Sequence, residues 1–140
     1  MDTSSPDWIG RELATLPDMI GRLRSVVLDT RDPGRLAEFY SAILGGEVVA
    51  EDETWVVLTE PTGRRLAFQL APEHEPPVFP DPRGSQQFHL DFEVDDVDEA
   101  ESMVLALGAT RVTDAVGEDD FRVYRDPAGH PFCLVWGVGS

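Results

Sequence analysis

An imidazole, an amide and a thiol are the side chains of this sequence best suited to chemistry: His89, aided by Asp91, with Gln69 and Cys133. His89 and Asp91 stand two positions apart in the alternating segment Gln87 to Val94, so both lie on one face of a predicted strand. An imidazole beside a carboxylate can act as a general base or orient a ligand. A half-buried structural histidine, hydrogen-bonded to Gln69 or to backbone, is the alternative.

The thiol and the glutamine each allow two interpretations. Cys133 could be a nucleophile if its thiolate paired with the His89 imidazolium. A small sulfur atom in the apolar run PFCLVW more often fills space, and we favour that interpretation. Gln69 can fix a ligand carbonyl or amide because its side chain both donates and accepts hydrogen bonds, or it can be a satisfied interior amide. The catalytic residues stay unassigned, with His89 as the one candidate.

These residues belong to an internal repeat. Residues 23–70 recur 64 positions later as residues 87–134. In that alignment Ser25 matches His89, and Gln69 matches Cys133. Because the two copies should place equivalent positions on related faces, we expect these four side chains to meet at the centre of one pocket.

Each copy of the repeat predicts the order β-α-β-β-β. Caps such as Asp32-Pro33 and Asp95-Asp96 begin the two helices, and Gly45-Gly46 and Gly108 end them. The strands expected from alternation and turn residues are 23–30, 47–50, 54–59, 65–70, 87–94, 110–113, 120–125 and 131–136. The predicted fold class is α+β, in which two βαβββ modules form a curved, cup-like mixed sheet with helices outside.

Strand parity divides each module into two faces. The apolar set, which includes Leu28, Phe68 and Phe132, should pack on the helices. The opposite, concave face mixes polar and small side chains, which is typical of a lined pocket. Aromatic and basic residues on neighbouring strands could border its opening and stack on a flat ligand, with core packing as the alternative. The predicted ligand-binding residues are Ser25, Gln69, His89, Asp91, Cys133, Trp55, Arg122 and Tyr124.

The charge composition of the chain limits the classes of molecule that it is expected to bind. Eleven basic and 27 acidic residues give a formal net charge of −16, which disfavours nucleic acid and anionic membrane surfaces and would attract a cationic ligand. Surface solvation is the alternative explanation of this acidity. The single cysteine excludes an intramolecular disulfide, and no secretory signal or spanning run is visible, so we expect a cytoplasmic protein.

The chain of 140 residues fits one domain with an N-terminal extension. Residues 1–22 lie outside the repeat, and Trp8, Ile9 and Leu13 recur at helical spacing, so a short amphipathic helix is expected there. Residues 23–140 form the domain, with module one at 23–70, a proline-rich linker at 71–86 and module two at 87–136. The linker prolines exclude a helix or a central strand.

A family resemblance is carried by three segments: LDTRDPGRLAEFYSAILGG, HLDFEVDDVDEAESMVLALGA and YRDPAGHPFCLVW. Together they cover most of residues 23–136, and they resemble the vicinal oxygen chelate (VOC) superfamily, also called the glyoxalase/bleomycin resistance/dioxygenase family. The nearest subgroup is the stand-alone glyoxalase-like domains with a Gln in the fourth strand and a Pro-rich linker before the HLD strand.

The resemblance bears on metal binding. In metal-dependent members, the positions that match Ser25, Gln69, His89 and Cys133 carry ligands such as His, Glu or Gln, His and Glu. This chain keeps His89, with Gln69 as a weak oxygen donor, whereas Ser25 is a poor ligand and Cys133 would make a soft, mixed site. Since a catalytic centre needs about three firm ligands, we predict no metal cofactor; if a metal binds, His89 and Gln69 hold it.

The function implied is binding of a small organic molecule in the concave sheet, independent of metal. A drug-sequestering, bleomycin-resistance-like role fits the acidity because such drugs are cationic. The alternative is a metal-dependent lyase or isomerase of the glyoxalase I type; a dioxygenase is disfavoured because its two histidines and carboxylate are absent. Relatives commonly pair, so a homodimer is expected. Whether the chain is an enzyme stays open.

Overall fold

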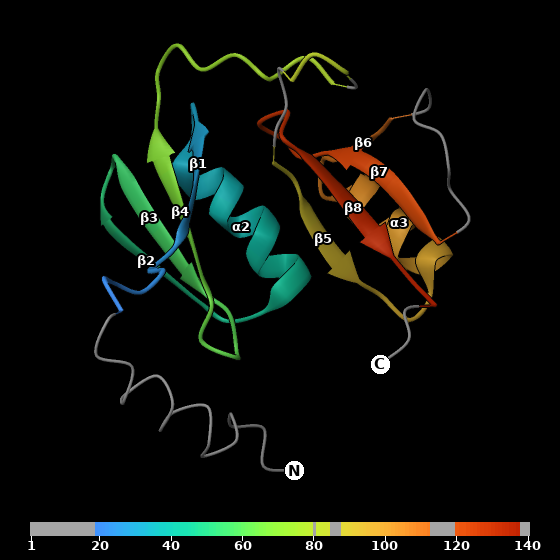
Figure 1. Ribbon diagram of the computed structural model, residues 1–140, viewed down its shortest axis with the longest axis horizontal. Coiled ribbons are helices and arrows are strands. Elements are labelled where there is room, and N and C mark those ends of the chain that lie inside the picture. The colour runs from blue at the N-terminus through green and yellow to red at the C-terminus, as the bar shows by residue number, and fades with distance from the viewer. Residues whose placement is uncertain (1–18, 80, 85–87, 113–119, 138–140) are drawn as a thin grey trace.

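The computed structural model describes residues 19–79, 81–84, 88–112 and 120–137. The predicted N-terminal helix with Trp8 lies outside these residues. Two modules of the order β-α-β-β-β follow one another along the chain, as the repeat predicts (Figure 1). Within the part of the chain that is described, no helix is long and apolar enough to cross a membrane.

Each module builds one mixed four-stranded sheet. The first orders its strands β1-β4-β3-β2 and the second β5-β8-β7-β6. In both, the first and last strands of the module pair in parallel and the remaining neighbours are antiparallel. The elements are β1 (Val26–Thr30), α2 (Pro33–Leu44), β2 (Glu47–Asp52), β3 (Trp55–Thr59), β4 (Arg65–Leu70), β5 (Leu90–Glu93), α3 (Val97–Ala106), β6 (Thr110–Arg111), β7 (Phe121–Arg125) and β8 (Pro131–Val135).

The boundaries follow the predicted caps closely. Asp32 begins α2 by accepting a hydrogen bond from the Arg35 amide at 3.1 Å, and Asp96 begins α3 in the same way. Some strand boundaries were wrong: β1 and β5 begin at Val26 and Leu90, later than predicted, and β2 continues to Asp52 through an acidic run that was predicted as a turn. The Asp52 carboxylate then closes the turn by accepting from the amide and hydroxyl of Thr54.

Helix α2 is the centre of the molecule rather than a cover on one module. Its side chains Leu36, Ala37, Phe39 and Tyr40 are at most 1% exposed. In Figure 1 it lies between the first sheet and β5. Tyr40 stacks on Phe68 of β4 and also contacts Phe92 of β5, with ring centroids 5.9 and 5.8 Å apart. The helix-facing sets of both sheets therefore share one core, which also buries Leu28, Phe132 and Leu134 as parity predicts.

A buried hydrogen bond crosses this core. The hydroxyl of Tyr40 donates to Oδ2 of Asp126 at 2.5 Å, and both residues are nearly inaccessible to solvent. Burial and the Asp126 charge raise the pKa of Tyr40 well above its ordinary value, so the phenol remains a donor. The other carboxylate oxygen accepts from the amides of Ala128 and His130, which fixes the turn between β7 and β8. One side chain thus ties α2 to the second module.

The proline-rich linker is held against the second module by Arg125. Its guanidinium donates to the carbonyls of Pro77 at 3.0 Å, Phe79 at 2.9 Å and Gly129 at 2.7 Å. Gly129 has a positive φ of 90°, and a Cβ there would lie 2.4 Å from Pro76, so only glycine fits. The linker therefore has a fixed path over the β7–β8 turn.

Two histidines complete this junction. Nε2 of His74 lies 3.0 Å from the carbonyl oxygen of Ala128, and Nε2 of His130 lies 2.7 Å from that of Asp29. Their rings are 5.0 Å apart. Both residues join segments far apart in sequence, so their role here is structural.

We predict that Tyr40→Phe lowers the free energy of unfolding by about 1–3 kcal/mol, because it leaves a buried carboxylate oxygen without its donor. Urea denaturation of the parent, Y40F, D126N and the double variant would measure the coupling between the two groups. A Y40F midpoint equal to that of the parent would contradict this account of the core.

Candidate functional site

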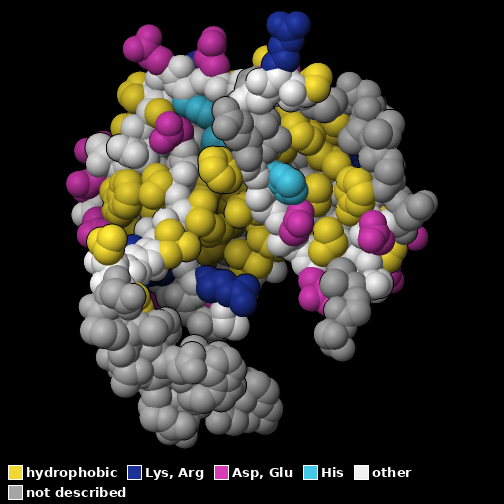
Figure 2. All heavy atoms as spheres, in the orientation of Figure 1, with side chains coloured by type: hydrophobic (Ala, Val, Ile, Leu, Met, Phe, Trp, Pro, Cys, Tyr) yellow, Lys and Arg dark blue, Asp and Glu magenta, His cyan; other side chains and the backbone are white. Residues whose placement is uncertain are grey.

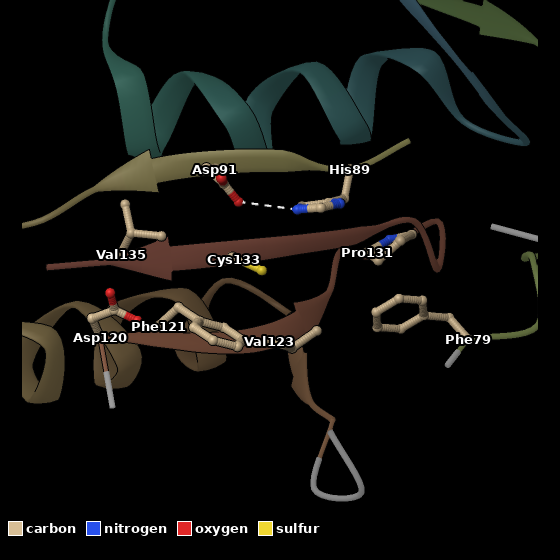
Figure 3. Close-up of a pocket in the computed structure, with 9 residues that line it drawn as sticks. All are labelled: Phe79, His89, Asp91, Asp120, Phe121, Val123, Pro131, Cys133 and Val135. Carbon is tan, nitrogen blue, oxygen red and sulfur yellow. Dashed lines mark ion pairs between the residues drawn. The ribbon is translucent and has the colours of Figure 1, made fainter. Parts of the chain in front are cut away.

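A cavity of about 530 Å³ opens on the face of the second sheet that points away from α3 (Figure 3). Strands β5, β7 and β8 supply most of its lining, and one linker residue closes a side. The lining residues are Phe79, His89, Asp91, Asp120, Phe121, Val123, Pro131, Cys133 and Val135. Its volume is in the range of small-molecule sites.

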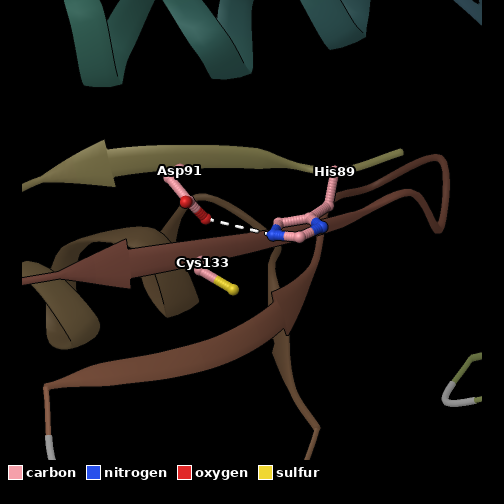
Figure 4. Close-up of side chains that lie close together, drawn as sticks. All are labelled: His89, Asp91 and Cys133. Atoms are coloured by element: carbon pink, nitrogen blue, oxygen red, sulfur yellow. Dashed lines mark ion pairs between the residues drawn. The ribbon is translucent and has the colours of Figure 1, made fainter. Parts of the chain in front are cut away.

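His89, Asp91 and Cys133 come together at this cavity (Figure 4). Nε2 of His89 is 3.2 Å from Oδ1 of Asp91, and both side chains are about half exposed. Asp91 pairs with Cys133 in the parallel β5–β8 ladder, which brings the thiol beneath the carboxylate. The sequence placed His89 and Asp91 on one strand face, and the register adds Cys133.

The Cys133 thiol is protonated near neutral pH. Burial raises its pKa to about 12, helped by the charge of Asp91 and by a hydrogen bond to it. Since the thiolate is the reacting form, a nucleophilic role at neutral pH is disfavoured. The interpretation of Cys133 as a buried, space-filling residue agrees with this, because it packs with Val112 and Val123 in a small apolar cluster.

The walls of the cavity are apolar and its charged groups are acidic. Phe79 and Phe121 contact that same cluster of Val112, Val123 and Cys133 from two sides. Asp91 and Asp120 are the carboxylates in the lining, and no arginine stands among the described residues that form it. A ligand with an apolar body and a positive charge matches these surroundings.

Arg122 and Tyr124 lie on the opposite face of β7, contrary to the expectation that they border the opening. Phe121 and Val123 point into the cavity, so their neighbours point toward α3. There the Tyr124 hydroxyl donates to Glu101 at 2.7 Å, and Arg122 bonds Asp98 at 3.0 Å. The sequence left the parity of this strand undecided, since both of its faces carry aromatic residues.

Ser25, Gln69 and Trp55 also lie outside this lining. Gln69 is exposed on the first sheet, where its register partners are Asp29 and Trp55. Ser25 lines a different cavity, described below. Of the eight predicted ligand-binding residues, the structure therefore brings together His89, Asp91 and Cys133.

The register also corrects the alignment of the two modules. The turn glycines Gly63 and Gly129 close equivalent turns and are 66 positions apart, not 64. With that offset Gln69 corresponds to Val135, so the predicted match of Gln69 with Cys133 is wrong. Two length changes cause this. Helix α3 is two residues shorter than α2, and the connection from the helix to the third strand is four residues longer in the second module, 107–120 against 45–54.

Six lining residues are not among the eight predicted ligand-binding residues: Phe79, Asp120, Phe121, Val123, Pro131 and Val135. Val123 and Val135 follow from strand parity once the register of β7 and β8 is known. Asp120 precedes β7 directly. Phe79 belongs to the linker, and no local pattern indicates that it reaches the second sheet.

Two mixed sheets of the order seen here, each with one helix, define the glyoxalase fold, and the comparisons agree. The model of the glyoxalase-like domain matches residues 25–135, and the chain belongs to this family. The VOC resemblance predicted from the three segments is thereby confirmed. No curated protein matches the chain in sequence.

Solved structures share this fold at low identity. A glyoxalase/bleomycin resistance protein/dioxygenase family enzyme from Burkholderia phytofirmans PsJN is 21% identical, with 84% of this chain and 100% of that chain covered at a TM-score of 0.64. The fosfomycin resistance protein FosX from Listeria monocytogenes is 18% identical, with 86% and 96% covered at 0.63. A glyoxalase-related enzyme from Fulvimarina pelagi is 18% identical, with 84% and 89% covered at 0.59.

Three side chains at this cavity carry atoms that could ligate a metal ion. One ligand atom each from His89, Asp91 and Cys133 lie within 4.8 Å of one another. Nitrogen, oxygen and sulfur donors together suit zinc, and a bound cation would favour the thiolate that the apoprotein disfavours. Gln69, expected to share a metal with His89, lies on β4 of the first sheet and does not line this cavity. The residues fit a zinc-like ion, with a set other than the expected one.

We predict that Cys133 reacts slowly with iodoacetamide and that Asp91→Asn accelerates the reaction about tenfold at pH 8, because the substitution removes a negative charge that raises the thiol pKa. Between pH 7 and 10 the parent rate should climb without a plateau. Glu93→Gln, which removes a charge two residues along the same strand, is the matched control. Equal rates for D91N and the parent would refute the role of Asp91.

Proposed function

We propose that the chain binds a small organic cation with an apolar body in the cavity of the second module, without a metal. The observation that carries the proposal is the combination of aromatic and aliphatic walls with the carboxylates of Asp91 and Asp120. A positive group placed between them would exchange solvent for two carboxylates, while its apolar part contacts Phe79 and Phe121.

The charge of the whole chain supports the same ligand class. A formal net charge of −16 concentrates cations near the surface and speeds their arrival at a site lined by carboxylates. His89 would orient the ligand, since its Nε2 is held by Asp91 and the remaining ring nitrogen can face the cavity. No catalytic step is assigned to it.

Drug sequestration is the finer form of this proposal. The Burkholderia relative bears the name of a glyoxalase/bleomycin resistance protein/dioxygenase family, and bleomycin-like drugs are cationic. Tight binding that withholds a drug from its target needs no reaction, so it agrees with a site in which no nucleophile is ionised at neutral pH. Association of two copies stays a prediction.

Calorimetric titration with benzyltrimethylammonium, phenylacetate and bleomycin would test the charge preference. We expect the two cations to bind and phenylacetate to bind at least tenfold more weakly at this site. Asp91→Asn and Asp120→Asn should each weaken cation binding several-fold, because each removes one attractive charge. Glu38→Gln, a neutralisation on the exposed side of α2, should leave it unchanged. Equal affinity of all variants for the cations would refute the proposal.

A metal-dependent lyase or isomerase is the second candidate, and the clustering of His89, Asp91 and Cys133 favours it. A zinc ion held there would supply polarisation of a substrate carbonyl. Elemental analysis of protein purified without chelators would decide: this candidate predicts about one zinc per chain, lost in Cys133→Ser and His89→Ala. Protein free of stoichiometric metal that also takes up none on zinc titration would exclude it.

A further inference from the structure

A second cavity, of about 490 Å³, lies between the two modules. It runs from the segment before β1, past the β3–β4 turn, to β5. Figure 2 shows an apolar hollow between the modules with basic side chains at its border. The lining residues are Leu23, Arg24, Ser25, Val26, Leu44, Glu60, Thr62, Gly63, Arg64, Arg65, Leu66, Leu90, Asp91 and Phe92.

The apolar part of this cavity is made by the outer layer of the shared core. Leu44 and Leu66 come from the first module, and Leu90 and Phe92 come from the second. These side chains belong to the helix-facing sets, so the cavity is on the other side of β5 from the cluster of His89 and Cys133. It is a separate site with its own surroundings.

Arginines gather here in an otherwise acidic molecule. The chain has 11 basic residues, and Arg24, Arg64 and Arg65 line this cavity. Arg22 lines an adjacent hollow, which shares Arg24 and Arg65 with it. Among the residues that the structure describes, none of these four guanidinium groups is within ion-pair distance of a carboxylate. Nε of Arg65 is shielded from solvent and has no hydrogen-bond partner there. An unpaired donor of this kind is costly, and an anion beside the same guanidinium would offset part of that cost.

Among the described residues, the two carboxylates in the lining form no ion pair with these arginines, although the Arg64 charge acts on Glu60. Glu60 accepts from the amides of Thr62 and Arg64, each at 2.9 Å, and from the Thr62 hydroxyl. That hydroxyl bond, with the Arg64 and Thr62 amides and the Arg64 charge, holds the pKa of Glu60 below its usual range. Asp91 is engaged by His89 on the opposite side of the strand.

We propose that this inter-module cavity binds an organic anion, a carboxylate or phosphate monoester attached to an apolar body. A guanidinium fork accepts either group in a bidentate manner, and burial strengthens the pairing. The anion would pair with the guanidinium groups that line the cavity, and the apolar body would cover Leu44, Leu66 and Phe92. The ligand charge is opposite to that proposed for the first cavity, and Asp91 is the one described residue that lines both cavities.

Isothermal titration of the full chain with decanoate tests the site, with decyltrimethylammonium and inorganic phosphate as comparisons. We expect decanoate to bind with one site per chain and phosphate alone to bind at least tenfold more weakly, because it lacks the apolar body. Arg24→Gln and Arg65→Gln should each weaken decanoate binding about tenfold or more, as expected for loss of a hydrogen bond to a charged group. A decyl phosphate arm would show which anion is preferred.

Arg83→Gln is the matched control, because it removes the same charge from an exposed linker position. Thermal melts of each variant would confirm that the fold is retained. Decanoate affinity unchanged in both R24Q and R65Q would overturn the proposal. So would the absence of binding at millimolar decanoate, or displacement of decanoate by decyltrimethylammonium at equal concentration, which would indicate an apolar surface without charge selection.

Discussion

The hydrogen bond between Tyr40 and Asp126 is the constraint on which the arrangement of the two modules depends. Tyr40 belongs to the first module, and Asp126 holds the turn that starts β8 in the second. A charged carboxylate is retained at 4% exposure only because the phenol and two amides satisfy it. With that turn fixed, β8 enters the sheet in the register that places Cys133 beside Asp91. The position of the thiol is therefore a consequence of a contact made on the far side of the sheet.

The two modules have diverged in what they offer a ligand. The second carries a carboxylate-lined cavity with an imidazole and a thiol. The first contributes arginines at its β3–β4 turn and before β1, where the modules meet. Although the chain is acidic as a whole, its basic residues are thus distributed unevenly, and local potential differs in sign between the two cavities. The net charge of the chain has the same sign as the charged side chains of the first cavity, but it gives no indication of the arginines in the second.

Local signals in the sequence were sufficient for the fold. Asp32-Pro33, Asp96 and the turn glycines placed the helices and strands within a few residues, because caps and turns act over short distances. Alternation in the strand after the linker put His89 and Asp91 on one face. Phe79 is positioned by a hydrogen bond to Arg125, 46 residues away, and Asp126 by one to Tyr40, 86 residues away. The periodicity of a sequence does not reveal contacts over such separations. Gln69 was misaligned for a related reason, since a length change in one connection is invisible to a fixed offset.

That length change also explains how a duplicated module can alter its site without losing its core. The offset between equivalent residues is 64 at the helix N-caps, 63 in the strand after each helix and 66 in the last two strands, which is a net change of two. Two is the period of a β-strand, so a net change of this size shifts the last strand along the first strand of its module while every side chain keeps its face. Buried leucines and phenylalanines stay inside, yet a different residue arrives at the position beside β5. A register shift of two residues therefore changes which residue lines the pocket, whereas a shift of one would turn the core side chains to the outside.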